Sequence, residues 1–74
     1  MEDEKVVISS LVVEARPESV DEVARALSAM EGVEVHEVSG YKIVVTIEAD
    51  TVDDSHDIAS GFIGIEGVTG INLV

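Results

Sequence analysis

The 74-residue sequence lacks cysteine and tryptophan and contains one proline, one tyrosine and one phenylalanine. Without thiols, the chain can form no disulfide and offers no thiolate for catalysis, zinc binding or iron–sulfur ligation. Basic residues are also scarce, because four Lys and Arg stand against sixteen Asp and Glu, a formal net charge of −12. This charge repels nucleic-acid phosphates and anionic lipid headgroups. We therefore expect no nucleic-acid partner and no direct membrane insertion.

Long apolar runs are missing as well. Ser, Glu or Gly interrupts each apolar stretch, so none reaches the roughly 18 residues that a membrane-spanning helix needs. Residues 1–5 are acidic, whereas a secretory signal starts with basic residues followed by an apolar segment. We therefore expect a cytoplasmic protein with a single domain, residues 1–74, whose acidic residues 1–5 are flexible.

Motifs that carry chemistry are absent from the sequence. It contains no GxSxG, no GxxxxGK[ST] and no GxGxxG. Residues 15–19 include one Arg and no Gly, unlike the anion-binding loop of acylphosphatases. Asp53 and Asp57 share a helix face with His56 to one side, and acids in a first helical turn are already favoured by the helix dipole. We expect no enzymatic activity, no catalytic residue, no cofactor and no metal site.

An internal repeat with a spacing of 34 to 35 residues organises the chain. Val-Glu-Ala at 13–15 is echoed by Ile-Glu-Ala at 47–49, and Glu-Gly-Val at 31–33 is echoed by the same three residues at 66–68. Within each copy, a segment rich in Val, Ile and Thr precedes a helical pattern and a second such segment follows it. This order predicts two copies of a β-α-β unit.

The predicted strands give the fold class. We expect an α+β protein of ferredoxin-like βαββαβ order, in which both helices cover one face of a four-stranded antiparallel sheet with strand order 4-1-3-2. A hairpin turn at Ser39-Gly40 joins the two units. The strands are predicted at residues 6–15, 33–38, 41–49 and 68–74.

The first helix is predicted to begin after Pro17. Ser19, with Glu22 three residues later, forms the pattern of a capping box. Gly32 is suited to the left-handed residue that ends a helix. The apolar residues of this segment recur at helical spacing and predict a single stripe facing the sheet: Val20, Val23, Ala24, Leu27 and Met30.

The second helix is predicted to be weaker. Thr51 is placed to cap it toward Asp54, and Gly67 to terminate it. Gly61 and Gly64 each cost about 1 kcal/mol relative to Ala, so we expect a frayed or tightened last turn. Its apolar stripe consists of Ile58, Phe62 and Ile65.

Strand residues alternate between the two faces of a sheet. The side chains predicted to face the helices are Val7, Ser9, Leu11, Val13, Ala15, Val33, Val35, Tyr41, Ile43, Val45, Ile47, Ala49, Ile71 and Leu73. The opposite face is open, and Glu34, Val38, Lys42, Gly70 and Val74 are among the residues predicted to point to it. The candidate binding residues on this open face and its acidic margin are Ile8, Ser10, Val12, Glu14, His36, Val44, Thr46, Glu48 and Asn72.

Ile8, Val12 and Val44 would form an exposed β-branched patch at the centre of this face. Such patches are often binding surfaces. A small sheet is also unable to hide both faces, and the patch is equally compatible with burial in a homodimer. Both a monomer and a weak homodimer therefore fit the sequence.

Several segments together resemble the NapD family of assembly chaperones. They are Ser10–Val13, the helix opening at Pro17, residues 31–36 and residues 40–48, and the match extends from about Ser9 to Val74. The resemblance implies a ferredoxin-like fold without catalysis. It also implies a cytoplasmic chaperone that binds the twin-arginine signal peptide of the molybdenum-containing catalytic subunit of periplasmic nitrate reductase. Such binding supports maturation and delays export until the cofactor is loaded.

Two alternatives share the same order of elements. One is a regulatory ligand-binding module of the ACT type, and the other is a structural dimerisation module. The effector loop of ACT modules normally has a Gly after the first strand, and the segment after Ala15 has none. An obligate dimer formed through the open face would favour these alternatives over a chaperone.

Overall fold

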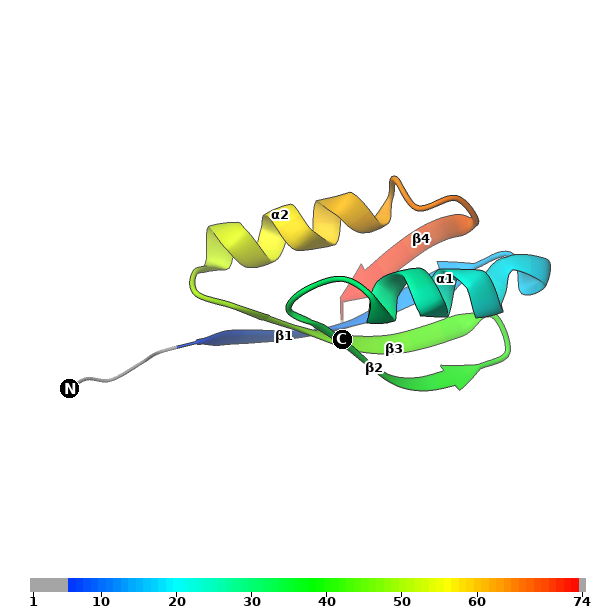
Figure 1. Ribbon diagram of the computed structural model, residues 1–74, viewed down its shortest axis with the longest axis horizontal. Helices are drawn as coiled ribbons and strands as arrows, with labels where there is room; N and C mark the ends of the chain where they lie inside the picture. Colours follow the sequence, from blue (N-terminus) through cyan, green and yellow to red (C-terminus); the bar gives the residue numbers. More distant parts are fainter. Residues whose placement is uncertain (1–5, 74) are drawn as a thin grey trace.

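The computed structural model describes residues 6–73. Its strands and helices follow the order β1, α1, β2, β3, α2, β4 (Figure 1). Their bounds are Val7–Ala15 for β1, Val20–Ser28 for α1, Val33–Ser39 for β2, Lys42–Ala49 for β3, Val52–Phe62 for α2 and Val68–Leu73 for β4. A 3-10 turn at Pro17–Ser19 precedes α1.

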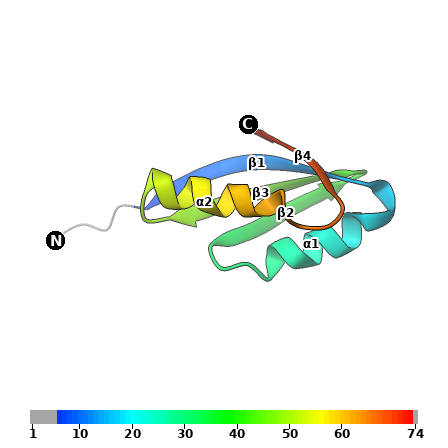
Figure 2. The ribbon, with the colours of Figure 1, turned by 90° about the horizontal axis from the view of Figure 1, so that it is seen from above.

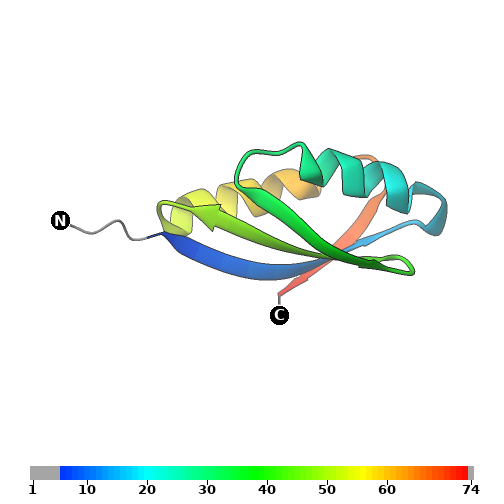
Figure 3. The ribbon, with the colours of Figure 1, turned by 60° about the horizontal axis from the view of Figure 1, so that its bottom comes forward.

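The four strands form one antiparallel sheet in the order β2-β3-β1-β4, which confirms the predicted strand order and the ferredoxin-like α+β class. Both helices lie on the same face of this sheet (Figure 1). Figure 3 shows the sheet from its side, with both helices above it and no described element below it. The fold therefore leaves one sheet surface uncovered, as the sequence predicts.

The core lies between the helices and the sheet. Leu11, Val13, Ile43, Val45 and Ile47 contribute from the two central strands, and each has at most 1% of its surface exposed. These odd-numbered residues are among those that strand alternation predicts to face the helices. The helices contribute the remaining large buried side chains, which are Val20, Val23, Leu27 and Phe62.

The two helices begin differently. The Oγ1 atom of Thr51 accepts a hydrogen bond of 3.0 Å from the backbone N–H of Asp54, which confirms the predicted cap of α2. The predicted capping box at Ser19 is wrong, because Ser19 makes no side-chain cap to α1. Ser19 ends the 3-10 turn with φ −112° and ψ −1°, whereas a capping residue needs an extended backbone.

Two equivalent glycines follow the helices. Gly32 has φ 84° and Gly67 has φ 101°, the left-handed region that glycine adopts without steric cost. A Cβ atom at Gly32 would lie 2.8 Å from the backbone oxygen of Glu48, and one at Gly67 would lie 2.7 Å from Cβ of Ser19. The repeated glycine thus lets each helix return closely to the sheet.

The end of α2 is tightened, as its glycines predict. Backbone N–H groups of Ile63, Gly64 and Ile65 donate to carbonyls three residues earlier, at 3.3, 3.1 and 3.0 Å. This is the 3-10 pattern that commonly closes an α-helix.

Tyr41 does not occupy its predicted inward position. Ser39 pairs with Lys42, so Gly40 and Tyr41 form the two-residue turn of the hairpin. The Tyr41 side chain is consequently 47% exposed instead of packing under the helices.

Some predictions concern parts of the chain that the structure does not describe. They concern the flexibility of residues 1–5 and the direction of the Leu73 and Val74 side chains. Within residues 6–73, no helix has the length and apolar character required to cross a bilayer.

Candidate functional site

The centre of the open face is a pair of valines on the two central strands. Val12 of β1 lies directly opposite Val44 of β3, and both are half-buried. Ser10 opposes Thr46 one step along, and Ile8 opposes Glu48 beyond that. Directly opposed residues on one face have Cβ atoms about 4.5–5.5 Å apart, so these side chains form one continuous surface.

The register supports a single surface for the predicted binding residues. Asn72 of β4 lies opposite Val12 on the other side of β1, and Gly70 lies opposite Glu14. The pairing therefore brings these predicted residues together on the face away from the helices: Ile8, Ser10, Val12, Glu14, Val44, Thr46, Glu48 and Asn72. His36 joins them from β2 through its contact with Thr46.

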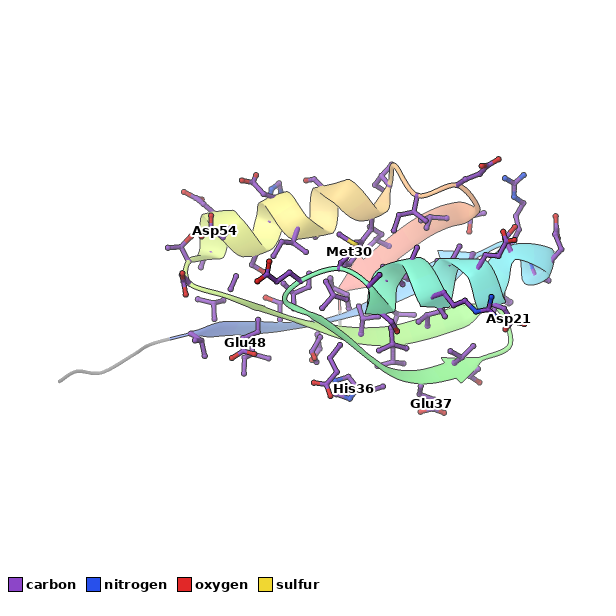
Figure 4. All side chains as sticks on the ribbon, in the orientation of Figure 1. Asp21, Met30, His36, Glu37, Glu48 and Asp54 are labelled. Atoms are coloured by element: carbon purple, nitrogen blue, oxygen red, sulfur yellow. The ribbon has the colours of Figure 1, made fainter. Side chains whose placement is uncertain are left out.

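A β-bulge in β2 brings Glu37 to the open face, where the sequence pattern did not predict it. Val35 pairs with Val45, but the next pairing partner is Glu37, opposite Val44. The extra residue is His36, and both His36 and Glu37 lie on the side of the sheet away from the helices (Figure 4). Of these two residues, simple alternation assigned His36 and not Glu37 to this face. The signal that could have revealed the bulge is the pair of consecutive polar residues between Val35 and Val38, where the apolar alternation shifts by one.

The same bulge corrects the prediction for Val38. Its backbone partner is Ile43, a fully buried residue of the helix-covered face. Val38 therefore belongs to that face, although it lies near the hairpin and stays 43% exposed. An inserted residue reverses the alternation for every residue after it.

Two side-chain hydrogen bonds hold polar groups on the open face. Nε2 of His36 and Oγ1 of Thr46 share a hydrogen bond of 2.8 Å. Nδ2 of Asn72 donates to Oε2 of Glu14 at 2.9 Å. The first bond links β2 to β3 and the second links β1 to β4. Hydrogen bonds therefore fix the direction of polar side chains on both sides of Val12 and Val44.

Negative charge surrounds the valine pair. The register places Glu14, Glu34, Glu37 and Glu48 on the open face, together with Lys42. The Nζ atom of Lys42 lies 5.7 Å from the centroid of the Tyr41 ring at the hairpin end. The face therefore combines a small apolar centre with a predominantly acidic margin.

Two shallow pockets extend this margin around the edge of the sheet. The first, of about 350 Å³, is lined by Ile8, Gly32, Val33, Glu34, Thr46 and Glu48. The second, of about 360 Å³, is lined by Glu31, Gly32, Glu48, Ala49, Asp50, Asp54, Asp57 and Ile58. They share Gly32 and Glu48, and the second adds Asp50, Asp54 and Asp57 near the start of α2.

The Asp and His residues near the start of α2 do not converge on one point. Asp54 and Asp57 line the second pocket, whereas His56 lines a different pocket beneath the other flank of α2. Across residues 6–73, no group of three or more His, Asp or Glu is placed to hold a metal ion. The open face offers surfaces for binding, and its hydroxyl–imidazole contact between Thr46 and His36 lies at an exposed position.

Comparisons with known proteins agree with this geometry. The family model described as NapD protein matches residues 6–74. The Chaperone NapD of Paracoccus pantotrophus is 39% identical over 67 residues, which cover 90% of this chain and 60% of that protein. This chain therefore spans less than two thirds of the length of that curated relative.

A solved structure of a NapD protein has the same fold as this chain. The solution structure of the E. coli Tat proofreading chaperone protein NapD superimposes with a TM-score of 0.89 at 26% identity, covering 95% of this chain and 76% of that chain. Both relatives are named as chaperones, which agrees with the prediction that this protein is not an enzyme. The match of the family model to nearly all of the sequence shows that the chain belongs to the NapD family.

Proposed function

We propose that this protein is a cytoplasmic chaperone that binds the twin-arginine signal peptide of a periplasmic nitrate reductase-type molybdoenzyme. Binding would support maturation of the catalytic subunit and delay its export until the cofactor is loaded. Membership of the NapD family and the names of the two relatives support a chaperone role. The observation that carries the proposal is the open face, whose apolar centre is enclosed by acidic residues.

The chemistry of the proposed client matches this surface. A twin-arginine signal peptide has a cationic start followed by an apolar segment. The apolar segment, as a helix lying across the sheet, would cover Val12, Val44 and the exposed Ile8. Glu48 and the adjoining acidic pockets lie at one end of this patch, where they would attract the arginines.

The proposal can be tested by titrating ¹⁵N-labelled protein with a synthetic twin-arginine signal peptide. We expect the largest amide shift changes at Val12, Val44 and Thr46, and smaller ones along the acidic margin. A peptide in which two glutamines replace the arginines controls for charge and should bind more weakly. Shift changes confined to the solvent side of α1 and α2 would overturn the proposal.

A further inference from the structure

The sequence contains two histidines, and they lie in different layers of the molecule. His36 belongs to the bulge of β2 and lies on the open face (Figure 4). His56 lies on α2, which packs on the covered face of the sheet above β1 and β3 (Figure 2). Histidine is the side chain whose charge ordinarily changes between pH 5 and 8. His36 is therefore positioned to change the charge of the open face within this range.

The hydrogen bond of His36 is compatible with both charge states of the ring. Nε2 of His36 lies 2.8 Å from Oγ1 of Thr46 at an exposed position. A hydroxyl group can donate to a neutral ring nitrogen and can accept from a protonated one. Protonation can therefore change the charge of the open face without breaking this contact between β2 and β3.

His36 lies where the acidic margin meets the apolar centre. Its partner Thr46 belongs to the open face of β3 and has Val44 and Glu48 as its neighbours on that face. The residue after His36 in the bulge, Glu37, pairs with Val44, which is one member of the valine pair. A peptide that covers the valine pair would therefore pass beside the imidazole ring.

Carboxylates outnumber cations around His36. The charged residues that the register places on the open face are Glu34 and Glu37 of β2, Glu48 and Lys42 of β3, and Glu14 of β1. Four carboxylates against one ammonium group leave an excess of three negative charges while the ring is neutral. Protonation would lower this excess by one and would place a positive charge beside the apolar centre.

We propose that the charge of His36 regulates peptide binding at the open face: the neutral ring permits a cationic peptide to bind, and the protonated ring weakens its binding. This inference rests on the twin-arginine proposal, because it assumes a cationic client on the same face. A positive ring repels the arginines of the peptide and offsets part of the carboxylate charge that attracts them.

The test compares the affinity of the full chain for a peptide at about pH 7.5 and about pH 5.5 by isothermal titration calorimetry. The probe is a twin-arginine signal peptide without His, Asp or Glu and with an acetylated N-terminus, so its own charge stays constant over this range. We expect about threefold to fivefold weaker binding at the lower pH, which is the size of effect that an exposed charge pair produces.

Variants of the two histidines form a matched set. His36→Gln cannot be protonated, so it should bind at both pH values as tightly as the wild type does at the higher one. His36→Lys carries a permanent positive charge and should bind weakly at both. His56→Gln removes a titratable group from the helix layer and should keep the pH dependence of the wild type. Both positions are exposed, and circular dichroism at each pH verifies the fold of every variant.

Linkage provides a second readout on the protein itself. If protonation of His36 weakens the peptide, the bound peptide must oppose protonation by the same factor. The ring signals of His36, followed by NMR during a pH titration, should therefore change over a lower pH range when the peptide is saturating. The ring signals of His56 should move much less, because that residue lies in the helix layer.

Two results would overturn this inference and leave the twin-arginine proposal intact. One is equal affinity of the wild type at the two pH values. The other is a pH dependence that persists in His36→Gln, because another titrating group would then be responsible. Failure of the peptide to bind at the higher pH would instead overturn the twin-arginine proposal, and the role of His36 with it.

Discussion

Alternate residues of β3 meet opposite surroundings in this molecule. On the helix-covered face, Val45 and Ile47 are completely buried. On the open face, Val44 and Thr46, each one residue earlier, are only half-buried. The sequence uses β-branched side chains on both faces, so residue type does not distinguish them. Position relative to the helices makes one face a core and leaves the other available for a partner.

The contrast between the two faces separates the residues that stabilise the fold from those that are available for binding. A 74-residue domain buries a small core, and domains of this size are marginally stable. Each core side chain therefore contributes a large fraction of the free energy of unfolding. The open face adds little to stability because its apolar atoms remain partly in water, so its residues are free to serve recognition.

The largest expected effect is on the core. Ile47→Ala should lower the free energy of unfolding by about 2–5 kcal/mol, because it removes a completely buried side chain and leaves a cavity. Val44→Ala, on the same strand but the open face, should lower it by less than about 1 kcal/mol. Urea denaturation followed by circular dichroism measures both. Equal losses for the two variants would contradict the separation of the faces.

Strand alternation made this comparison predictable from the sequence. Every second position is apolar from Leu11 to Ala15 in β1 and from Ile43 to Ala49 in β3, and the repeat places these positions in equivalent parts of two β-α-β units. Once both helices cover one face, the even-numbered residues of these strands must form the other. The strand order and the open-face positions of Val12, Val44 and Asn72 follow from that reasoning.

Departures from ideal geometry were not predictable. The sequence trace of the bulge at His36 is one shift in the apolar alternation, from Val35 to Val38, and β2 ends at Ser39, which leaves no further alternation to fix the new phase. Ser19 has the residue type of a cap but lies at the end of a 3-10 turn. The pairing of β4 with β1 shifts its register between Glu14 and Ala15. Each of these features is set by backbone geometry and not by local composition.

The next effect is on binding at the open face. Replacing both Val12 and Val44 by Ala should weaken the twin-arginine peptide about tenfold or more, since each buried CH₂ contributes about 0.8 kcal/mol. Isothermal titration calorimetry gives the affinity, and thermal unfolding verifies the fold. Leu27 lies in the core under α1, and Leu27→Met serves as a control that should leave affinity unchanged. Unaltered binding by the double variant would move the site away from the valine pair.

The smallest effect concerns the acidic margin. Replacing Glu14 and Glu48 by Gln keeps the shape of both side chains and the acceptor for Asn72 but removes two charges from the open face. We expect about threefold weaker binding of the twin-arginine peptide, because exposed charge pairs contribute roughly 0.2–1 kcal/mol each.

The matched control is Asp21→Asn with Glu22→Gln on α1, which removes the same net charge from exposed positions of the helix layer. Both double variants change the long-range field alike, so both should slow association and reduce its salt dependence. Only the open-face pair should also raise the dissociation rate, because only there would the carboxylates contact the bound peptide. Surface plasmon resonance at two salt concentrations separates these contributions, and identical dissociation rates for the two variants would reduce the acidic margin to a steering role.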